Sequence, residues 1–469
     1  MAHQEAFERD KLINPVHTFI DSRTIVLILY PDEPDGAPLK QLDSNPPFLH
    51  GWLIWLIATI FVVYQLILQT SYAAINGSLS SELSITGTQS SLLASSFLFT
   101  YALIQLPAGL MLDRHNLKWL LSAAALICSL ATLSFSLLDN YWTLVISRAF
   151  MGVSAGFAFP GAGLIARRWI RPSQFALAMG LIDLLFCGGA IIGNAGIGEL
   201  LHSMSWRTIT QWLAALGGVI ALLIVMVIRS SPRGHAQPAM SGHISIGQSF
   251  LELIRTRQVW LGMVFYGGIC ASVFGFYGLW DVPLQEAFKF SHDDALTLNS
   301  WMFIGMGIGA VISGLIADWW GRRKPLMVVG SIGSTLAIAV VIFTPVESYT
   351  STVIQLFVNG LLLGTGVLVF PAVCESLPRG YSGAAIGSVN AVGIMSGALL
   401  QFIPGLFVSS DTSSTLHTYQ QTLVVFLIAM FLATLAALKM HETRPGWDNA
   451  VTDDNENLDP HPNSPPTTG

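Results

Sequence analysis

The chain has 469 residues, of which 52% are hydrophobic and only 11% are charged. Soluble domains carry about 25% charged residues, so the composition excludes most classes of soluble protein. The net charge of −6 argues against a nucleic-acid-binding protein, because such proteins carry basic surfaces. The apolar residues come in runs of about twenty, which is long enough for a helix to cross a bilayer.

The N-terminal segment, residues 1–50, is polar apart from one apolar patch at 24–30. That patch is too short to span a membrane. It also lies too far along the chain to be the apolar region of a signal peptide. We therefore expect the segment to stay in the cytoplasm.

Twelve apolar runs follow, and they predict membrane-spanning helices at 52–77, 88–112, 117–138, 141–167, 174–202, 207–229, 259–287, 297–319, 324–346, 350–376, 383–409 and 418–440. Several runs exceed twenty residues, which implies tilted or protruding helices. The runs form two groups, 51–229 and 258–440, on either side of a linker at 230–257 that is rich in Gly, Pro and Ser. The acidic tail, 441–469, has the composition of a disordered cytoplasmic segment.

The distribution of lysine and arginine sets the orientation. With the N-terminus in the cytoplasm, only Arg207 and Lys289 of the 22 Lys and Arg residues fall outside, and Arg148 falls within a span. The remaining 19 are then cytoplasmic, as the positive-inside rule requires. This distribution predicts a multi-pass protein of the inner membrane with both termini in the cytoplasm.

The two groups of spans repeat one another. Three pairs recur at nearly one period: Asp113 and Asp318 at 205 residues, Pro160 and Pro371 at 211, Gly180 and Gly387 at 207. The period predicts an all-α membrane protein with twelve transmembrane helices in two pseudo-symmetric six-helix bundles. Parallel halves around a site at mid-membrane are an architecture of secondary transporters.

Two charged turns carry a family resemblance. The second turn, GLIADWWGRRK at 314–324, contains Gly314, Asp318, Gly321, Arg322 and Arg323. The first turn, GLMLDRHNLK at 109–118, keeps Gly109, Asp113, Arg114 and Lys118. With the twelve spans, these turns resemble the major facilitator superfamily, over about residues 50–440.

The resemblance implies that both turns are cytoplasmic gating motifs. We expect Asp113 to meet a helix N-terminus, where the helix dipole favours a carboxylate, and a nearby Arg. The first copy has Asn116 and Leu117 where Gly and a basic residue are usual. Asparagine tolerates the left-handed backbone conformation that Gly would supply, so the turn can form without Gly, and we expect the second copy to be the stiffer latch.

A second signature of the family lies in span four, where Arg148 is followed by Gly152 and Gly156 at helical spacing. Span five has the glycines of CGGAIIGNAG (187–196) without the Gly-Pro pair that marks many drug/proton antiporters. This departure disfavours a drug exporter. The overall pattern resembles bacterial importers of nutrients or siderophores.

Charged residues inside the bilayer are costly and usually functional. Arg148 lies about two turns into span four. It either faces a central cavity, where it binds an anionic substrate group or couples to a proton site, or it snorkels to the outer interface. The glycine spacing favours the cavity. Arg148 enters from outside and Asp183 from inside, so we do not expect the two to pair.

Two carboxylates are candidates for proton coupling, because burial disfavours the charged form. Asp183 lies about ten residues into span five, and Asp281 lies in span seven. Asp183 could instead be hydrogen-bonded to a neighbouring helix or wetted from the cytoplasm. Asp281 could simply mark the outer end of its helix.

Several uncharged polar residues are candidate substrate ligands. Gln65, Gln69, Tyr72 and Asn76 share one face of span one, which must meet protein or water. Their functional reading is cavity lining, and the alternative is hydrogen bonding between helices. Tyr266 and Tyr277 share a face of span seven, and Asn359 and Asn390 lie in spans ten and eleven. We expect Phe99 and Tyr101 to serve in packing.

No pattern indicates an enzyme. No nucleophile–base arrangement is apparent, and GMGIGA (305–310) lies within a span, where small residues serve helix packing. The histidines avoid the spans and the four cysteines lie singly in apolar runs. We therefore expect no catalytic residue, no metal site and no cofactor.

These features predict a secondary active transporter that works by alternating access. We expect proton-coupled uptake of a small polar or anionic organic solute, such as an amino acid, a carboxylate or a siderophore, by a monomer in the lipid bilayer without nucleic acid. The alternatives are efflux by proton antiport and a non-transporting membrane sensor on the same scaffold.

Overall fold

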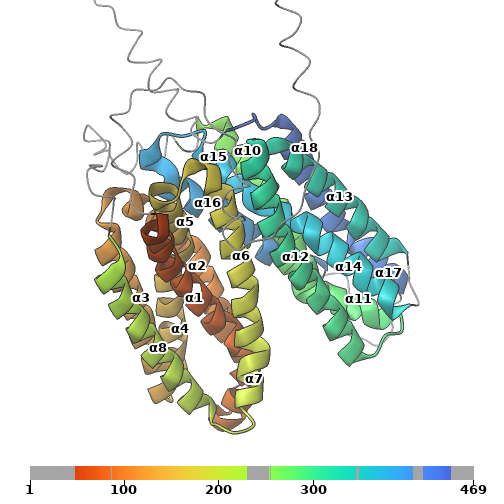
Figure 1. The fold of residues 1–469 in the computed structure, drawn as a ribbon. Coiled ribbons are helices and arrows are strands. Elements are labelled where there is room, and N and C mark those ends of the chain that lie inside the picture. Colours follow the sequence, from red (N-terminus) through yellow and green to blue (C-terminus); the bar gives the residue numbers. More distant parts are fainter. Residues whose placement is uncertain are drawn as a thin grey trace, which may run out of the picture. The chain divides into compact units, whose positions relative to one another are not determined.

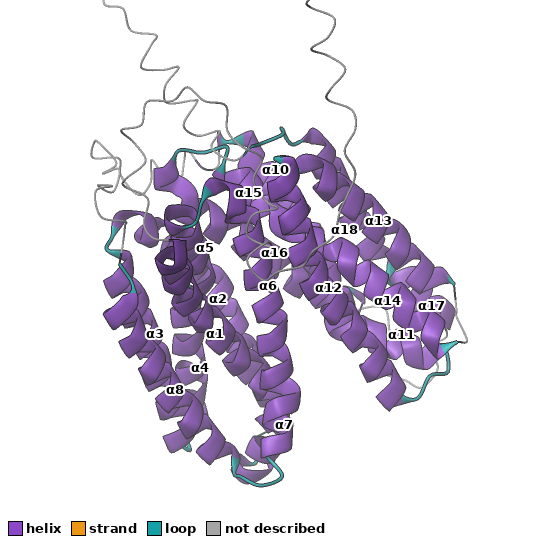
Figure 2. Cartoon of the chain, viewed as in Figure 1, coloured by secondary structure: helices purple, strands orange, loops and turns teal. Residues whose placement is uncertain are grey.

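The computed structural model describes residues 48–85, 87–229, 253, 255–344, 348–404 and 416–444. Within these ranges every regular element is a helix, and twelve helices are long and apolar enough to cross a membrane (Figures 1 and 2). The predicted all-α fold with twelve spans is confirmed. Most of the N-terminal segment 1–50, of the linker 230–257 and of the tail 441–469 lies outside the described residues, so those boundaries stay predictions.

The first six spans form the N-terminal bundle. They are α1 (Phe48–Leu83), α2 (Gly87–Arg114), α3 (Leu117–Leu137), α4 (Tyr141–Ala155) with α5 (Ala158–Trp169), α6 (Phe175–Ile191) with α7 (Ile197–Leu200), and α8 (Trp206–Val227). Within this bundle α3 packs against α8 and α4, and α1 packs against α5 and α6.

The last six spans form the C-terminal bundle. They are α10 (Arg257–Cys270) with α11 (Asp281–Ala287), α12 (His292–Trp320), α13 (Lys324–Phe343), α14 (Tyr349–Leu363) with α15 (Val369–Cys374), α16 (Ser382–Phe402), and α17 (Leu416–Thr422) with α18 (Val424–Lys439). Here α12 packs against α14, and α10 packs against α16 and α18.

The helix ends follow from local capping. The Asn140 side chain accepts hydrogen bonds from the first backbone N–H groups of α4, and Ser291 does the same for α12. Gly321 ends α12 in the left-handed conformation, at φ +67°. The first turn does not use the left-handed conformation that asparagine tolerates, because Asn116 has φ −66° and its side chain caps α3 by accepting from the Lys118 N–H. The two charged turns therefore reverse the chain by different backbone conformations.

Four spans depart from regular α-helix, three within their length and one at its end. Span four breaks between α4 and α5 at Gly156–Phe157, and span ten passes through a 3₁₀ turn, Gly364–Leu368. Pro160 and Pro371 each occupy the first turn of the following helix, where the missing N–H costs no helical hydrogen bond. Spans five and seven contain π-helical segments, Ile192–Gly196 and Ala271–Trp280, of a kind often found at functional sites.

The two bundles meet most extensively through two helix pairs, α6 with α12 and α2 with α16, and also where α5 contacts α16. Glycines make both crossings. A Cβ on Gly180 would lie 2.3 Å from the Ala310 carbonyl oxygen, and a Cβ on Gly109 would lie 2.3 Å from that of Gly383. Small residues allow such close backbone approach in membrane helices. The bundles are thus in main-chain contact at the end of the protein that carries Asp113 and Asp318.

Candidate functional site

A small cavity lies between the two bundles. It has about 20 Å³ of space, which is room for about one water molecule. The lining comes from spans of both bundles: Tyr101, Phe159, Asp183, Phe186, Tyr266, Ile269, Cys270, Val273, Phe274, Met306, Asn390 and Ile394. Because its walls belong to two bodies, any relative motion of the bundles changes the size of this cavity.

Asp183 supplies the only carboxylate among these lining residues. Its side chain is 5% exposed, and it has no hydrogen bond or ion pair with any described residue. It lines the same cavity as Tyr266 and Cys270 of α10. A buried carboxylate without a donor is poorly compensated as an anion. Asp183 is therefore suited to hold a proton or to accept a hydrogen bond from a ligand.

The cavity has polar groups besides Asp183. Tyr101 on α2 and Asn390 on α16 line it from different bundles, and Tyr266 and Cys270 line it from α10. The sequence indicated packing for Tyr101, whereas the structure places it in the cavity wall. Its spacing of four from Gln105, and of eight from Gly109, puts it on the helix face that meets α16. That spacing could have identified it.

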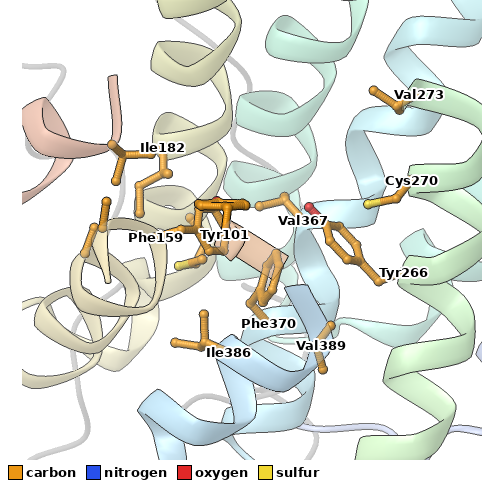
Figure 3. Close-up of a cluster of buried hydrophobic side chains, with 14 of the residues drawn as sticks. Tyr101, Phe159, Ile182, Tyr266, Cys270, Val273, Val367, Phe370, Ile386 and Val389 are labelled. Atoms are coloured by element: carbon orange, nitrogen blue, oxygen red, sulfur yellow. The ribbon is translucent and has the colours of Figure 1, made fainter. Parts of the chain in front are cut away.

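Aromatic rings bridge the bundles around the cavity (Figure 3). The Phe159 ring lies 5.0 Å from the Phe370 ring, which lies 4.9 Å from the Tyr266 ring, both measured between centroids. Phe186 on α6 faces Phe274 at 6.4 Å. These separations fall in the range of favourable aromatic pairs. Figure 3 shows Phe370 between Phe159 and Tyr266, which come from different bundles.

Arg148 lies in the N-terminal bundle and does not line the cavity. Its Nη1 donates to the Leu68 carbonyl at 3.0 Å and its Nε to the Leu93 carbonyl at 3.5 Å. The guanidinium lies 4.7 Å from the Tyr72 ring and 5.0 Å from the Phe97 ring. The side chain is 3% exposed, and no described carboxylate pairs with it. Arg148 is thus a buried cation held by carbonyl dipoles and ring faces.

The polar face of span one lies apart from the cavity lining. Tyr72 contacts Arg148, and Asn76 accepts a hydrogen bond from Ser80. Gln65 is fully buried, and neither atom of its amide has a hydrogen-bond partner among the described residues. Gln69 is half-buried. Of this set, the structure brings Tyr72 to Arg148, and none of the four residues lines the cavity.

A third polar group lies inside the C-terminal bundle. The Asn359 amide donates to the Tyr277 hydroxyl, and Asn299 donates to the Tyr277 carbonyl. Asp281 is fully buried and accepts from the Gln285 amide at 3.1 Å. Of the predicted ligands and proton sites, the structure thus gathers Asp183, Tyr266 and Asn390 in one cavity. Arg148 with Tyr72, and Tyr277 with Asn359, lie elsewhere.

The charged turns join the bundles. Asp113 accepts hydrogen bonds from the backbone N–H groups of Gly383 and Ala384 at the start of α16, both at 2.8 Å. Asp318 accepts from Leu177 at 2.7 Å and from Ala176 at 3.4 Å at the start of α6. We call these two sets of contacts the Asp113 latch and the Asp318 latch. Each places a carboxylate at a helix N-terminus, which the helix dipole favours.

Further ion pairs strengthen the second latch. Arg323 is fully buried, and its guanidinium pairs with Asp318 at 2.9 Å and with Glu375 at 3.0 Å. Glu442, beyond the last span, accepts from the backbone N–H of Arg323 and of Lys324 at the start of α13. The basic residues Lys118 and Arg322 lie over the rings of Trp119 and Trp320. The Asp318 latch is therefore part of a wider buried charge network.

Among the described residues, no group of three or more His, Cys, Asp or Glu side chains is placed to hold a metal ion. The four cysteines are buried free thiols. The described residues therefore form a cavity between two bundles, and these bundles are held together at one end by the two latches.

Comparisons with known proteins agree with this arrangement. The family model described as the Major Facilitator Superfamily matches residues 56–401. The chain is 24% identical to the gentisate transporter of Corynebacterium glutamicum, over 83% of this chain and 87% of that protein. It is 21% identical to a probable L-galactonate transporter of Escherichia coli, over 76% of this chain and 82% of that protein.

The fold also matches a solved structure. A Major Facilitator Superfamily transporter, FucP, in the outward conformation, superposes with a TM-score of 0.62 at 14% identity, over 83% of this chain and all of that one. The match over most of the twelve spans, with a latch in each bundle, gives the family: the chain is a multi-pass membrane protein that belongs to the Major Facilitator Superfamily of transporters and is not an enzyme.

Proposed function

We propose that the protein is a secondary active transporter that takes up a small organic anion across the inner membrane together with protons. The transporters of gentisate and L-galactonate that it resembles are named for organic acids. Alternating access about the cavity between the bundles supplies the mechanism, and a monomer contains both bundles.

The observation that supports an anionic substrate is the buried side chain of Arg148. A guanidinium buried without a carboxylate is a fixed positive charge in a low-dielectric region, where its field reaches far. Its neighbour Phe97 stacks on Tyr101 at 6.2 Å, and Tyr101 lines the cavity. Arg148 therefore lies behind the cavity wall, and its charge draws an anionic group toward the space between the bundles.

Asp183 supports the coupling to protons. An anion that enters the cavity is repelled by a charged Asp183 and accepted by a neutral one. Binding of the anion and of a proton therefore favour each other, which is the condition for symport. Asp281 is a second candidate proton site, although it already has the Gln285 amide as a partner.

The latches support an outward-facing state. The excess of Lys and Arg at the Asp113 and Asp318 end makes that end cytoplasmic under the positive-inside rule. Both latches are closed at that end. Release of substrate to the cytoplasm then requires the hydrogen bonds from Asp113 and Asp318 to the opposite bundle to break.

Uptake into proteoliposomes tests the proposal. Purified protein is reconstituted and supplied with radiolabelled gentisate, benzoate, L-galactonate or D-glucuronate, with and without an inwardly directed proton gradient. We expect accumulation of at least one organic acid, and its collapse when a protonophore is added. Gradient-driven export of these acids would instead establish antiport. Absence of both flux and binding for the whole panel would overturn transport of organic acids.

A further inference from the structure

The walls of the cavity are unusually rich in flat apolar surface. Five of its lining residues are aromatic: Tyr101, Phe159, Phe186, Tyr266 and Phe274. They come from α2, α5, α6, α10 and the π-helical segment of span seven, so rings face the space from both bundles. Ring faces and edges pair favourably with another ring. Such walls complement a planar apolar ligand.

The same walls carry few polar side chains. Besides the Cys270 thiol they are Tyr101, Asp183, Tyr266 and Asn390, and the other seven lining residues are apolar. A sugar acid carries a hydroxyl on nearly every carbon, and each buried hydroxyl without a partner costs about 1–3 kcal/mol. The mostly apolar lining therefore favours a ligand with an apolar ring and few hydroxyl groups.

We propose that the substrate is an aromatic carboxylate with a ring hydroxyl. Its ring packs between the bundles against Phe159, Tyr266 and Phe274, and its hydroxyl donates to Asp183. The inference rests on the proposed function and names its substrate class. The ring is larger than the present space of about 20 Å³, and the walls can separate because they belong to two bodies.

Two measurements on the full chain test the inference. In detergent, a ligand raises the melting temperature as its concentration exceeds its Kd, which reports binding without transport. In proteoliposomes, the same ligands compete with labelled substrate. The probes are benzoate, 3-hydroxybenzoate and gentisate as aromatic acids, and D-glucuronate and L-galactonate as sugar acids. We expect 3-hydroxybenzoate and gentisate to bind at least about tenfold more tightly than either sugar acid, since tenfold is about 1.4 kcal/mol.

Matched variants locate the binding to the cavity. Phe159→Leu keeps an apolar side chain but removes a ring, so we expect about tenfold weaker binding of 3-hydroxybenzoate. The control is Phe150→Leu on α4, whose side chain is 54% exposed on the outer surface of the bundle. Asp183→Asn should reduce the preference for 3-hydroxybenzoate over benzoate, whereas a merely structural role would weaken both ligands equally.

The outcomes separate the two proposals. Tighter binding and accumulation of the sugar acids would overturn the aromatic assignment while leaving transport of organic acids intact. Equal effects of Phe159→Leu and Phe150→Leu would place the ring elsewhere and also overturn it. If no acid of either class binds or moves, both proposals fail together.

Discussion

The ring of Phe159 on α5 meets the ring of Phe370 on α15, with 5.0 Å between their centroids. Each residue directly precedes the proline of its repeat, Pro160 or Pro371, so the two rings occupy corresponding positions in the two bundles. The pair lies beside the cavity and is made by residues of two bodies. It must therefore form and break as the bundles move.

A double-mutant cycle measures this contact. We expect Phe159→Leu and Phe370→Leu each to lower the melting temperature in detergent, and so the free energy of unfolding. The double variant should lose less unfolding free energy than the sum of the two single losses. The shortfall should be about 1 kcal/mol, the usual value for an aromatic pair. Strict additivity of the two losses would show that the rings do not support one another.

Arg148 should separate stability from function. Arg148→Met removes a buried charge that has no carboxylate partner, so we expect a melting temperature equal to or above that of the wild type. Uptake of the organic acid should fall about 10- to 100-fold, the loss expected when a charge-assisted interaction of roughly 1.5–3 kcal/mol disappears. Arg148→Lys keeps the charge and should retain part of the uptake. Wild-type uptake by Arg148→Met would remove this residue from anion binding.

Asp183 and Asp281 form a natural comparison, because both are buried carboxylates and only Asp183 lines the cavity. We expect Asp183→Asn to abolish accumulation driven by a proton gradient while exchange of labelled for unlabelled substrate continues, since the amide mimics the protonated acid but cannot release a proton. Asp281→Asn should retain gradient-driven accumulation. The reverse pattern would assign coupling to Asp281.

The Asp113 latch can be followed through a native thiol. Cys374 is fully buried beside the latch, with its sulfur 3.8 Å from the Ser382 carbonyl. In a variant that keeps only this cysteine, Asp113→Asn should raise the rate of maleimide labelling about 5- to 30-fold, the population change for 1–2 kcal/mol. Substrate affinity should change little. A change in affinity with unaltered labelling would argue against a latch.

The glycine crossings allow a matched pair on one helix. On α6, a Cβ at Gly180 would lie 2.3 Å from the Ala310 carbonyl oxygen, whereas a Cβ at Gly188 would meet nothing within 4 Å. Gly180→Ala should therefore force α6 and α12 apart, raise labelling of Cys374, and slow uptake about tenfold or more. Gly188→Ala should behave as the wild type. Similar behaviour of both variants would mean that the crossing tolerates a methyl group.

The spans were predictable from the sequence because their signal is local. Twenty apolar residues in a row exclude most other structures, and the positions of Pro160 and Pro371 exposed the repeat. The backbone conformation of the turn at Asn116 could not be read from the sequence, for a physical reason. A helix cap and a left-handed residue both suit asparagine, and only the path of α3 decides between them.

The grouping of site residues could not be predicted, because it depends on packing between spans. Helical spacing placed Tyr266 and Tyr277 on one face, but the π-helical segment Ala271–Trp280 changes the rotation between them. Tyr277 consequently bonds Asn359 while Tyr266 lines the cavity. Tyr101 was overlooked because a lone aromatic residue in an apolar run carries no distinguishing local signal.

At the latched end of this protein, the two bundles are joined through backbone groups. Asp113 and Asp318 accept hydrogen bonds from backbone N–H groups, and glycines allow the backbones of facing helices to touch. The cavity, by contrast, is built from side chains. Mutation rewrites side chains freely and leaves the peptide backbone chemically the same. Substitutions can therefore change the substrate that such a transporter binds while the backbone contacts at its closed end stay the same.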